Sequence, residues 1–222
     1  MIELQRDGEV YVIRMDADEN RFRPDFVMAW NIALDEVEAA PGPKALVTTG
    51  TGKFYSNGLD LEWMLSQERD QGNAYLESVL AVLGRVLVFP AFSVAALNGH
   101  AFGAGALLAL AHDVRVMRSE RGYFCMPEID LRAPLHPGMT AIIQARLPRQ
   151  TAHEVIVTGT RYGAELALER RIVDHALPEL EVLPRAIAIA AERAAKADPV
   201  MTRLKTDLYR DVLEALRAQL VL

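Results

Sequence analysis

The sequence contains a single cysteine, Cys125, in 222 residues, so no disulfide can form within the chain. The absence of disulfides fits a reducing compartment. The first residues lack the basic and apolar segments of a signal peptide, and the final Leu220-Val221-Leu222 is not a peroxisomal address. We therefore predict a cytoplasmic protein.

The sequence also lacks an excess of positive charge. Its 24 Lys and Arg residues are outnumbered by 30 Asp and Glu residues, giving a formal net charge of -6. A nucleic-acid-binding domain is expected to be strongly basic, so we predict no nucleic-acid partner. An anionic ligand held by a few local positive groups is not excluded by this balance.

Long uninterrupted apolar runs are absent too. Residues 86–111 carry no Lys, Arg, Asp or Glu, but Pro90, Asn98 and Gly99 interrupt them. A hydropathy window alone would favour a membrane span here. The interruptions instead predict a buried strand, a glycine turn and a buried helix, and we predict no membrane association.

Apolar residues make up 51% of the chain and charged residues 24%, an ordinary globular composition. Helices are expected from Pro24 to the Pro41-Gly42-Pro43 segment, from Asp60, over 73–88 and over 103–110, and from Met139 onward helices dominate. Strands are predicted at 10–15, 45–49, 92–97, 114–117, 123–126 and 172–173. An α/β fold with a helical C-terminal part follows from this order of strands and helices.

A glycine-rich loop spans residues 53–60, between a predicted strand and a predicted helix. Gly58 allows backbone angles that other residues avoid, and such a loop can direct a backbone N–H into a cleft. Most glycine turns, however, only reverse the chain. Taken alone, this loop leaves both interpretations open.

Residues 98–107 form a second glycine-rich segment, which follows a strand and opens a helix at Gly103. The first turn of a helix has unpaired N–H groups and a partial positive charge, which suit an anion or a developing oxyanion. The spacing is not that of a dinucleotide-binding fingerprint. The alternative is a helix of small residues packed tightly against a sheet.

Glu128 stands among the apolar residues Met126, Ile129 and Leu131. A carboxylate in such surroundings is partly desolvated, which raises its pKa and makes it a better base. The alternative is a Glu that faces solvent at the end of a strand. Asp130 is expected to be a loop or capping residue and not a second catalytic group.

The ordered set of a glycine loop, a glycine helix start and Pro127-Glu128 resembles the crotonase, or enoyl-CoA hydratase/isomerase, superfamily, and within it most closely the monofunctional delta3-delta2-enoyl-CoA isomerases. Thr158-Gly159 and Ile172-Val173-Asp174 extend the resemblance. It implies a ββα superhelix with a core at 1–178 and a short helical region of the same domain at 179–222.

The resemblance also implies roles for individual residues. The backbone N–H groups of Leu59 and Ala104 would form an oxyanion hole for a thioester carbonyl, and Glu128 would be the single catalytic acid/base. The family's hydratases carry a second glutamate at the position of Leu107. Leucine cannot orient water, so the resemblance implies an isomerase that moves a double bond from C3 to C2 and makes a hydratase unlikely.

The implied substrate is an acyl-CoA thioester, and no further cofactor is expected because coenzyme A is part of the substrate. The five histidines show no metal-ligand spacing, so we predict no metal. Arg21 and Arg23 could approach its phosphates, or could be solvated loop charges. The resemblance implies a homotrimer or a dimer of trimers. Another crotonase reaction (hydration, thioester hydrolysis or carbon–carbon cleavage) and a non-catalytic acyl-CoA-binding protein remain alternatives. The predicted substrate-binding residues are Arg21, Phe22, Asn57, Gly58, Asp60, Leu61, Gly103 and Leu107.

Overall fold

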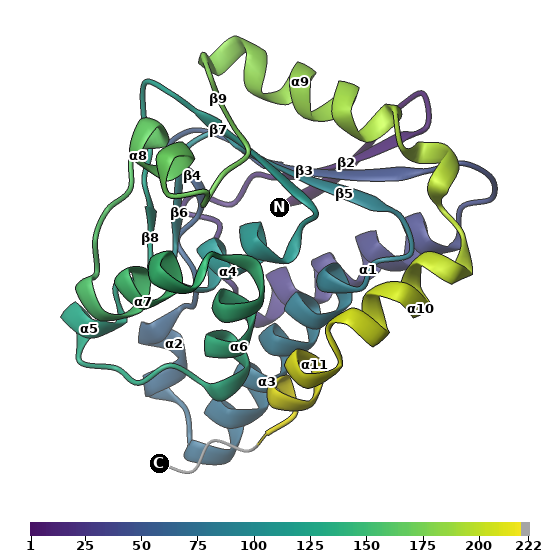
Figure 1. Ribbon diagram of the computed structural model, residues 1–222. Helices are drawn as coiled ribbons and strands as arrows, with labels where there is room; N and C mark the ends of the chain where they lie inside the picture. The colour runs from purple at the N-terminus through teal and green to yellow at the C-terminus, as the bar shows by residue number, and fades with distance from the viewer. Residues whose placement is uncertain (219–222) are drawn as a thin grey trace.

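The computed structural model describes residues 1–218 and contains one large and one small β-sheet with helices around them (Figure 1). The large sheet has the strand order β1-β2-β3-β5-β7-β9, and only the β1–β2 pair is antiparallel. The small sheet has the parallel order β4-β6-β8. The large-sheet strands are β1 (Ile2–Asp7), β2 (Val10–Met15), β3 (Ala45–Gly50), β5 (Phe92–Leu97), β7 (Val114–Arg118) and β9 (His175–Leu177), and the small-sheet strands are β4 (Phe54–Ser56), β6 (His100–Phe102) and β8 (Phe124–Cys125).

The chain repeats one structural unit three times. A strand of the large sheet is followed by a strand of the small sheet and then by helix: β3-β4-α2-α3, β5-β6-α4 and β7-β8-α5. This succession confirms the predicted ββα superhelix. The helices are α1 (Pro24–Ala39), α2 (Leu61–Ser66), α3 (Arg69–Leu87), α4 (Ala104–Ala111), α5 (Glu128–Leu131), α6 (Pro137–Arg146), α7 (Arg149–Thr158), α8 (Ala164–Glu169), α9 (Glu179–Ala191), α10 (Pro199–Leu208) and α11 (Arg210–Leu216), with a 3₁₀ turn at Ala194–Lys196.

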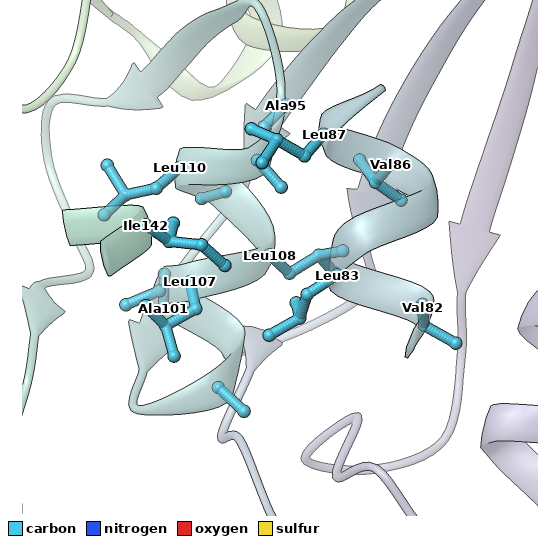
Figure 2. Close-up of a cluster of buried hydrophobic side chains, with 14 of the residues drawn as sticks. Val82, Leu83, Val86, Leu87, Ala95, Ala101, Leu107, Leu108, Leu110 and Ile142 are labelled. Atoms are coloured by element: carbon cyan, nitrogen blue, oxygen red, sulfur yellow. The ribbon is translucent and has the colours of Figure 1, made fainter. Parts of the chain in front are cut away.

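The large sheet is covered on both faces. Alternate residues of β2 point to opposite sides, so Val10 and Val12 pack with α9 while Ile13 and Met15 join the larger core. Figure 1 shows α9 on one face and α1, α3 and α4 on the other. Figure 2 shows the centre of the larger core, where α3 and α4 pack together and Ile142 of α6 joins them. Among residues 1–218, no helix combines the length and the apolar character that crossing a bilayer requires.

Several sequence-based boundaries need correction. The strand β1 was not predicted, since only Ile2 and Leu4 among its residues are even partly buried and apolar. The strands β4 and β6 lie inside the two glycine-rich segments, 53–60 and 98–107, where no strand was predicted. The predicted strand at 172–173 is wrong: Ile172 and Val173 are buried in the turn after α8, and the strand follows as β9. Ile172 and Val173 are therefore apolar because they are buried, and not because they form a strand. The predicted helix over 73–88 begins earlier, at Arg69.

Partly buried charges join the C-terminal helices to the core. Lys205 of α10 donates to Asp113 at 2.7 Å, and Arg146 of α6 donates to the Tyr209 hydroxyl at 2.5 Å. The same guanidinium donates to the Leu110 carbonyl in the last turn of α4. Residues 219–222, the end of the predicted helical region, lie outside the described residues.

Candidate active site

The small sheet brings the three sequence motifs to one place. Gly58, Gly103 and Glu128 follow β4, β6 and β8 respectively, within a few residues. Because these strands are parallel neighbours, their carboxyl ends lie at the same edge. The two glycine segments and Glu128 therefore meet there, as the resemblance to the crotonase superfamily implied.

Gly58 lies in direct contact with the start of α4. Its φ of +80° is a left-handed conformation that favours glycine. A Cβ at this position would lie 2.7 Å from the carbonyl oxygen of Phe102 and 3.0 Å from the backbone nitrogen of Ala104. Only a residue without a side chain lets the two loops approach this closely.

The peptide unit between Gly58 and Leu59 has a defined orientation. The Phe22 N–H donates to the Gly58 carbonyl at 2.8 Å. The peptide bond is trans, so the Leu59 N–H points in the opposite direction, away from Phe22. Within residues 1–218, no backbone carbonyl accepts a hydrogen bond from this N–H. Leu59 therefore presents a donor that is available for a ligand.

Ala104 offers a second donor as the first residue of α4. The Gly103 carbonyl accepts from the Leu107 N–H at 3.0 Å, so the Ala104 N–H points out of the N-terminal end of the helix. Gly103 has a φ of +51°, and its own N–H is held by the Cys125 carbonyl of β8 at 3.0 Å. The aligned peptide dipoles of α4 give this end of the helix a partial positive charge.

Glu128 is the first residue of α5 and lies beside Gly103. A Cβ on Gly103 would be 3.4 Å from the Glu128 Oε1 atom. The Oε2 atom is buried and has no hydrogen-bond partner among the described residues. Burial raises the pKa of Glu128 from 4.5 to about 6. This carboxyl group can therefore exchange a proton near neutral pH, and the alternative of a freely solvated Glu is wrong.

The remaining predicted binding residues lie before α1 (Arg21 and Phe22), in the glycine loop (Asn57 and Asp60), at the start of α2 (Leu61) and in α4 (Leu107). Glu19 accepts from Arg21 Nε at 2.7 Å and from Asn57 Nδ2 at 2.9 Å, and the Phe22 side chain is fully buried. Asp60 caps α2 as predicted, accepting from the Trp63 N–H at 3.1 Å, and Leu61 begins that helix. Leu107 is fully buried in α4. A hollow of about 280 Å³ is lined by Ala17, Asp18, Glu19, Arg21, Arg23 and Asp60.

The sequence did not reveal the buried residue, Asn20, that supports the glycine loop. Asn20 is fully buried with a φ of +52°, and its side chain donates to the carbonyls of Phe54 and Tyr55 at 3.2 Å. Its own carbonyl accepts from Ser56 Oγ at 2.7 Å. Asn tolerates a left-handed backbone, and this property could have indicated the role of Asn20 from the sequence. Asn20 therefore supports the loop from the interior.

Metal ligands are not clustered in the part of the chain that the structure covers. No three His, Cys, Asp or Glu side chains between residues 1 and 218 come together closely enough to hold a metal ion.

Comparison with solved structures defines the class of fold. The human mitochondrial delta3-delta2-enoyl-CoA isomerase superposes with a TM-score of 0.88 at 20% identity, over 97% of this chain and 90% of that one. The chain therefore has the crotonase fold, an α/β superhelix of ββα units.

The sequence comparisons define the family. The profile described as enoyl-CoA hydratase/isomerase matches residues 5–222. The chain is 31% identical to the peroxisomal enoyl-CoA delta isomerase 2 of Arabidopsis thaliana, over 96% of its own length and 93% of the relative. It is 32% identical to a putative enoyl-CoA hydratase of Thermus thermophilus, over 94% and 83%. This protein belongs to the enoyl-CoA hydratase/isomerase family.

Proposed function

We propose that the protein is an enoyl-CoA isomerase that moves a double bond from C3 to C2 of an enoyl-CoA. One observation carries the proposal: a desolvated carboxyl group, Glu128, lies beside Gly103 at the start of α4 while Leu107, one turn into that helix, is apolar. Double-bond migration needs one group that both removes and returns a proton. Hydration needs a second group to orient water, and leucine cannot do this.

In the proposed reaction, the Glu128 carboxylate removes a proton from C2 of the 3-enoyl-CoA. The electron pair of the broken C–H bond moves toward the thioester carbonyl and forms a dienolate. The N–H groups of Leu59 and Ala104 donate to the dienolate oxygen, and such preorganised donors are worth roughly 3–4 kcal/mol each. Glu128 then returns the proton to C4, and the double bond lies between C2 and C3. Returning the proton regenerates the Glu128 carboxylate.

The test of this function is an assay with purified protein and 3-enoyl-CoA esters of several chain lengths. We expect conversion to the conjugated 2-enoyl-CoA, and hydration of 2-enoyl-CoA at least about 100-fold slower, because one of two acid/base groups is missing. Absence of isomerisation with every ester that binds would refute the proposal. Hydration as fast as isomerisation would assign the protein to the hydratases.

The pH dependence of kcat/KM should report the ionisation of Glu128. The reaction begins with the carboxylate, so protonation removes activity. With the pKa raised to about 6, kcat/KM is expected to be constant above pH 7 and to fall tenfold per pH unit below about 6. Initial rates between pH 4.5 and 8.5 measure this profile. An inflection near 4.5 would contradict a desolvated carboxyl group.

Arg21 is proposed to contact a phosphate of coenzyme A from the hollow beside Asp60. The Arg21→Ala variant should raise KM about threefold to tenfold and leave kcat unchanged, since a half-exposed charge contributes roughly 1 kcal/mol. The Arg210→Ala variant, whose guanidinium pairs with Asp207 on the distant α10–α11 segment, is the control. An unchanged KM for Arg21→Ala would remove this residue from the binding site.

The proposal includes a cytoplasmic location and a homotrimer or a dimer of trimers. The location rests on the presence of a single cysteine, which fits a reducing compartment, and the assembly rests on the resemblance to the family. Two of the related isomerases of Arabidopsis thaliana are named peroxisomal. Fluorescence microscopy of the tagged protein in its native cell tests the location. Light scattering of the purified protein tests the assembly.

A further inference from the structure

Tyr75 of α3 connects two segments that hold Leu59. Its hydroxyl donates to the carbonyl of Phe22 and accepts from the N–H of Asp60, the latter at 3.0 Å. The side chain is 4% exposed, so both bonds are shielded from water. A single buried hydroxyl therefore links the segment before α1 to the glycine loop.

The two peptide units on either side of Leu59 are thereby fixed. On the N-terminal side, the Gly58 carbonyl accepts from the Phe22 N–H at 2.8 Å. On the C-terminal side, the Asp60 N–H donates to Tyr75. The backbone of Leu59 has only two soft dihedral angles, and they lie between these two peptides. Holding both peptides determines where the Leu59 N–H points.

Phe22 forms a hydrogen bond with each of the two segments, the glycine loop and Tyr75 of α3. Its N–H holds the Gly58 carbonyl, and its carbonyl is held by Tyr75. The bridge between Phe22 and Leu59 has the parallel geometry of two adjacent strands. The N–H and the carbonyl of Phe22 belong to the two peptide units that meet at its Cα, so Phe22 connects the Gly58 carbonyl to the Tyr75 hydroxyl. The hydroxyl of Tyr75 therefore holds the Asp60 peptide directly and the Gly58 peptide through Phe22.

We propose that Tyr75 is a positioning residue that sets the direction of the Leu59 N–H toward the thioester oxygen. This inference rests on the proposed function, in which that N–H is one of two oxyanion donors. A donor in the wrong direction is expected to leave binding of the ester largely intact, because the oxyanion charge has not yet developed in the bound substrate. It weakens the stabilisation of the dienolate, which develops only during the reaction.

The surroundings of Tyr75 suit this role. Its ring packs edge-on against Trp63 of α2, with 5.0 Å between the ring centroids, and the Trp63 N–H bonds to Asp60. Ring contacts therefore stay in place when only the hydroxyl is removed. Burial raises the pKa of Tyr75 to about 12, so the hydroxyl remains a donor throughout the working pH range.

The test compares Tyr75→Phe with the wild-type enzyme and with Tyr162→Phe. Tyr162 is fully buried, and its hydroxyl donates to Glu154 at 3.0 Å outside the site, so Tyr162→Phe is the matched loss of one hydroxyl. For Tyr75→Phe we expect kcat to fall about tenfold with KM changed less than twofold, because misdirection weakens one donor without removing it. Tyr162→Phe should keep the wild-type kcat.

A vibrational measurement separates this inference from a purely structural role. Saturated butyryl-CoA with a ¹³C-labelled thioester carbonyl does not isomerise, and difference infrared spectroscopy reports how strongly its carbonyl is polarised when bound. The wild-type enzyme and Tyr162→Phe should lower the carbonyl frequency equally, and Tyr75→Phe should lower it less. Hydrogen exchange at the 58–61 backbone should be faster only in Tyr75→Phe.

Failure of the proposed function and failure of the proposed role of Tyr75 would give different results. A wild-type enzyme that binds butyryl-CoA with no change in carbonyl frequency would refute the oxyanion hole, and the proposed function with it. A normal frequency change in the wild-type enzyme that Tyr75→Phe retains in full, together with unchanged exchange at 58–61, would refute the role of Tyr75 alone. If Tyr75→Phe unfolds at a temperature where Tyr162→Phe remains folded, Tyr75 is a stability residue and the inference is wrong.

Discussion

The Glu128→Gln variant is expected to lose isomerase activity by about 10³–10⁴ in kcat while it still binds acyl-CoA. Glutamine has nearly the same size and shape but can neither accept nor return a proton, and general acid/base groups contribute about 10²–10⁴-fold each. The upper part of this range applies because one carboxyl group performs both proton transfers. Stopped-flow or steady-state rates with a 3-enoyl-CoA measure the loss, and calorimetry with butyryl-CoA measures the binding.

The same substitution should make the folded protein more stable above pH 6. The carboxyl group is easier to ionise in the unfolded chain, with a pKa of 4.5, than in the folded one, with a pKa of about 6. The folded state therefore holds an extra proton between these values, and stability falls as pH rises through them. Glutamine does not ionise, so the free energy of unfolding at pH 7.5 should increase by about 1–2 kcal/mol.

Asp130→Asn is the control for Glu128→Gln. Asp130 lies on the same short helix but is exposed, and the sequence analysis gave it no catalytic role. Its amide variant should keep kcat within about twofold of the wild-type value, as an exposed carboxylate outside the site contributes little. Equal losses in the two variants would mean that α5 as a whole, and not the Glu128 carboxylate, supports the reaction.

The Gly58→Ala variant is expected to lose about 10²–10³ in kcat, the effect of removing one oxyanion donor. The added methyl group would lie 2.7 Å from the Phe102 carbonyl oxygen and 3.0 Å from the Ala104 nitrogen, too close for either atom to stay in place. Both loops must then separate, which displaces the Leu59 and Ala104 N–H groups. The substitution also places alanine at a φ of +80°, which costs about 1–3 kcal/mol of stability.

Gly42→Ala separates the steric contact from the backbone strain. Gly42 has nearly the same φ, +79°, but nothing lies within 4 Å of an added Cβ. Thermal unfolding should therefore show a loss of stability in both variants, and kinetics should show a loss of kcat only in Gly58→Ala. Wild-type kcat in a folded Gly58→Ala variant would show that the close approach of the loops is dispensable.

The sequence predicted the parts of the fold that depend on local patterns. The helix start at Pro24, the N-cap at Asp60 and the helix that begins next to Gly103 are all present, because prolines, caps and apolar spacing act over a few residues. The order of the glycine segments and Glu128 carried the resemblance to the crotonase superfamily, and that resemblance implied that they meet. The desolvation of Glu128 was predicted from three apolar neighbours, but only Met126 is buried, while Ile129 and Leu131 are exposed.

The missed features depend on contacts between distant segments. Asn20 supports β4 from more than thirty positions away in the chain, and Tyr75 reaches Phe22 across a separation of 53 residues. Short strands such as β6 are defined by their partners and have little pattern of their own. Ile172 and Val173 misled the prediction because a buried turn and a buried strand are equally apolar.

The enclosure of Leu107 constrains how this protein could have diverged from relatives with other activities. Its side chain is fully buried in a cluster with Ala101, Leu108 and Ile142 (Figure 2). A glutamate acquired there in one step would place a carboxyl group in that cluster, at a loss of several kcal/mol from a total stability of about 5–15 kcal/mol. Under the proposed function, a change from double-bond migration to water addition would therefore require the contact between α4 and α6 to be reshaped to accommodate the carboxyl group.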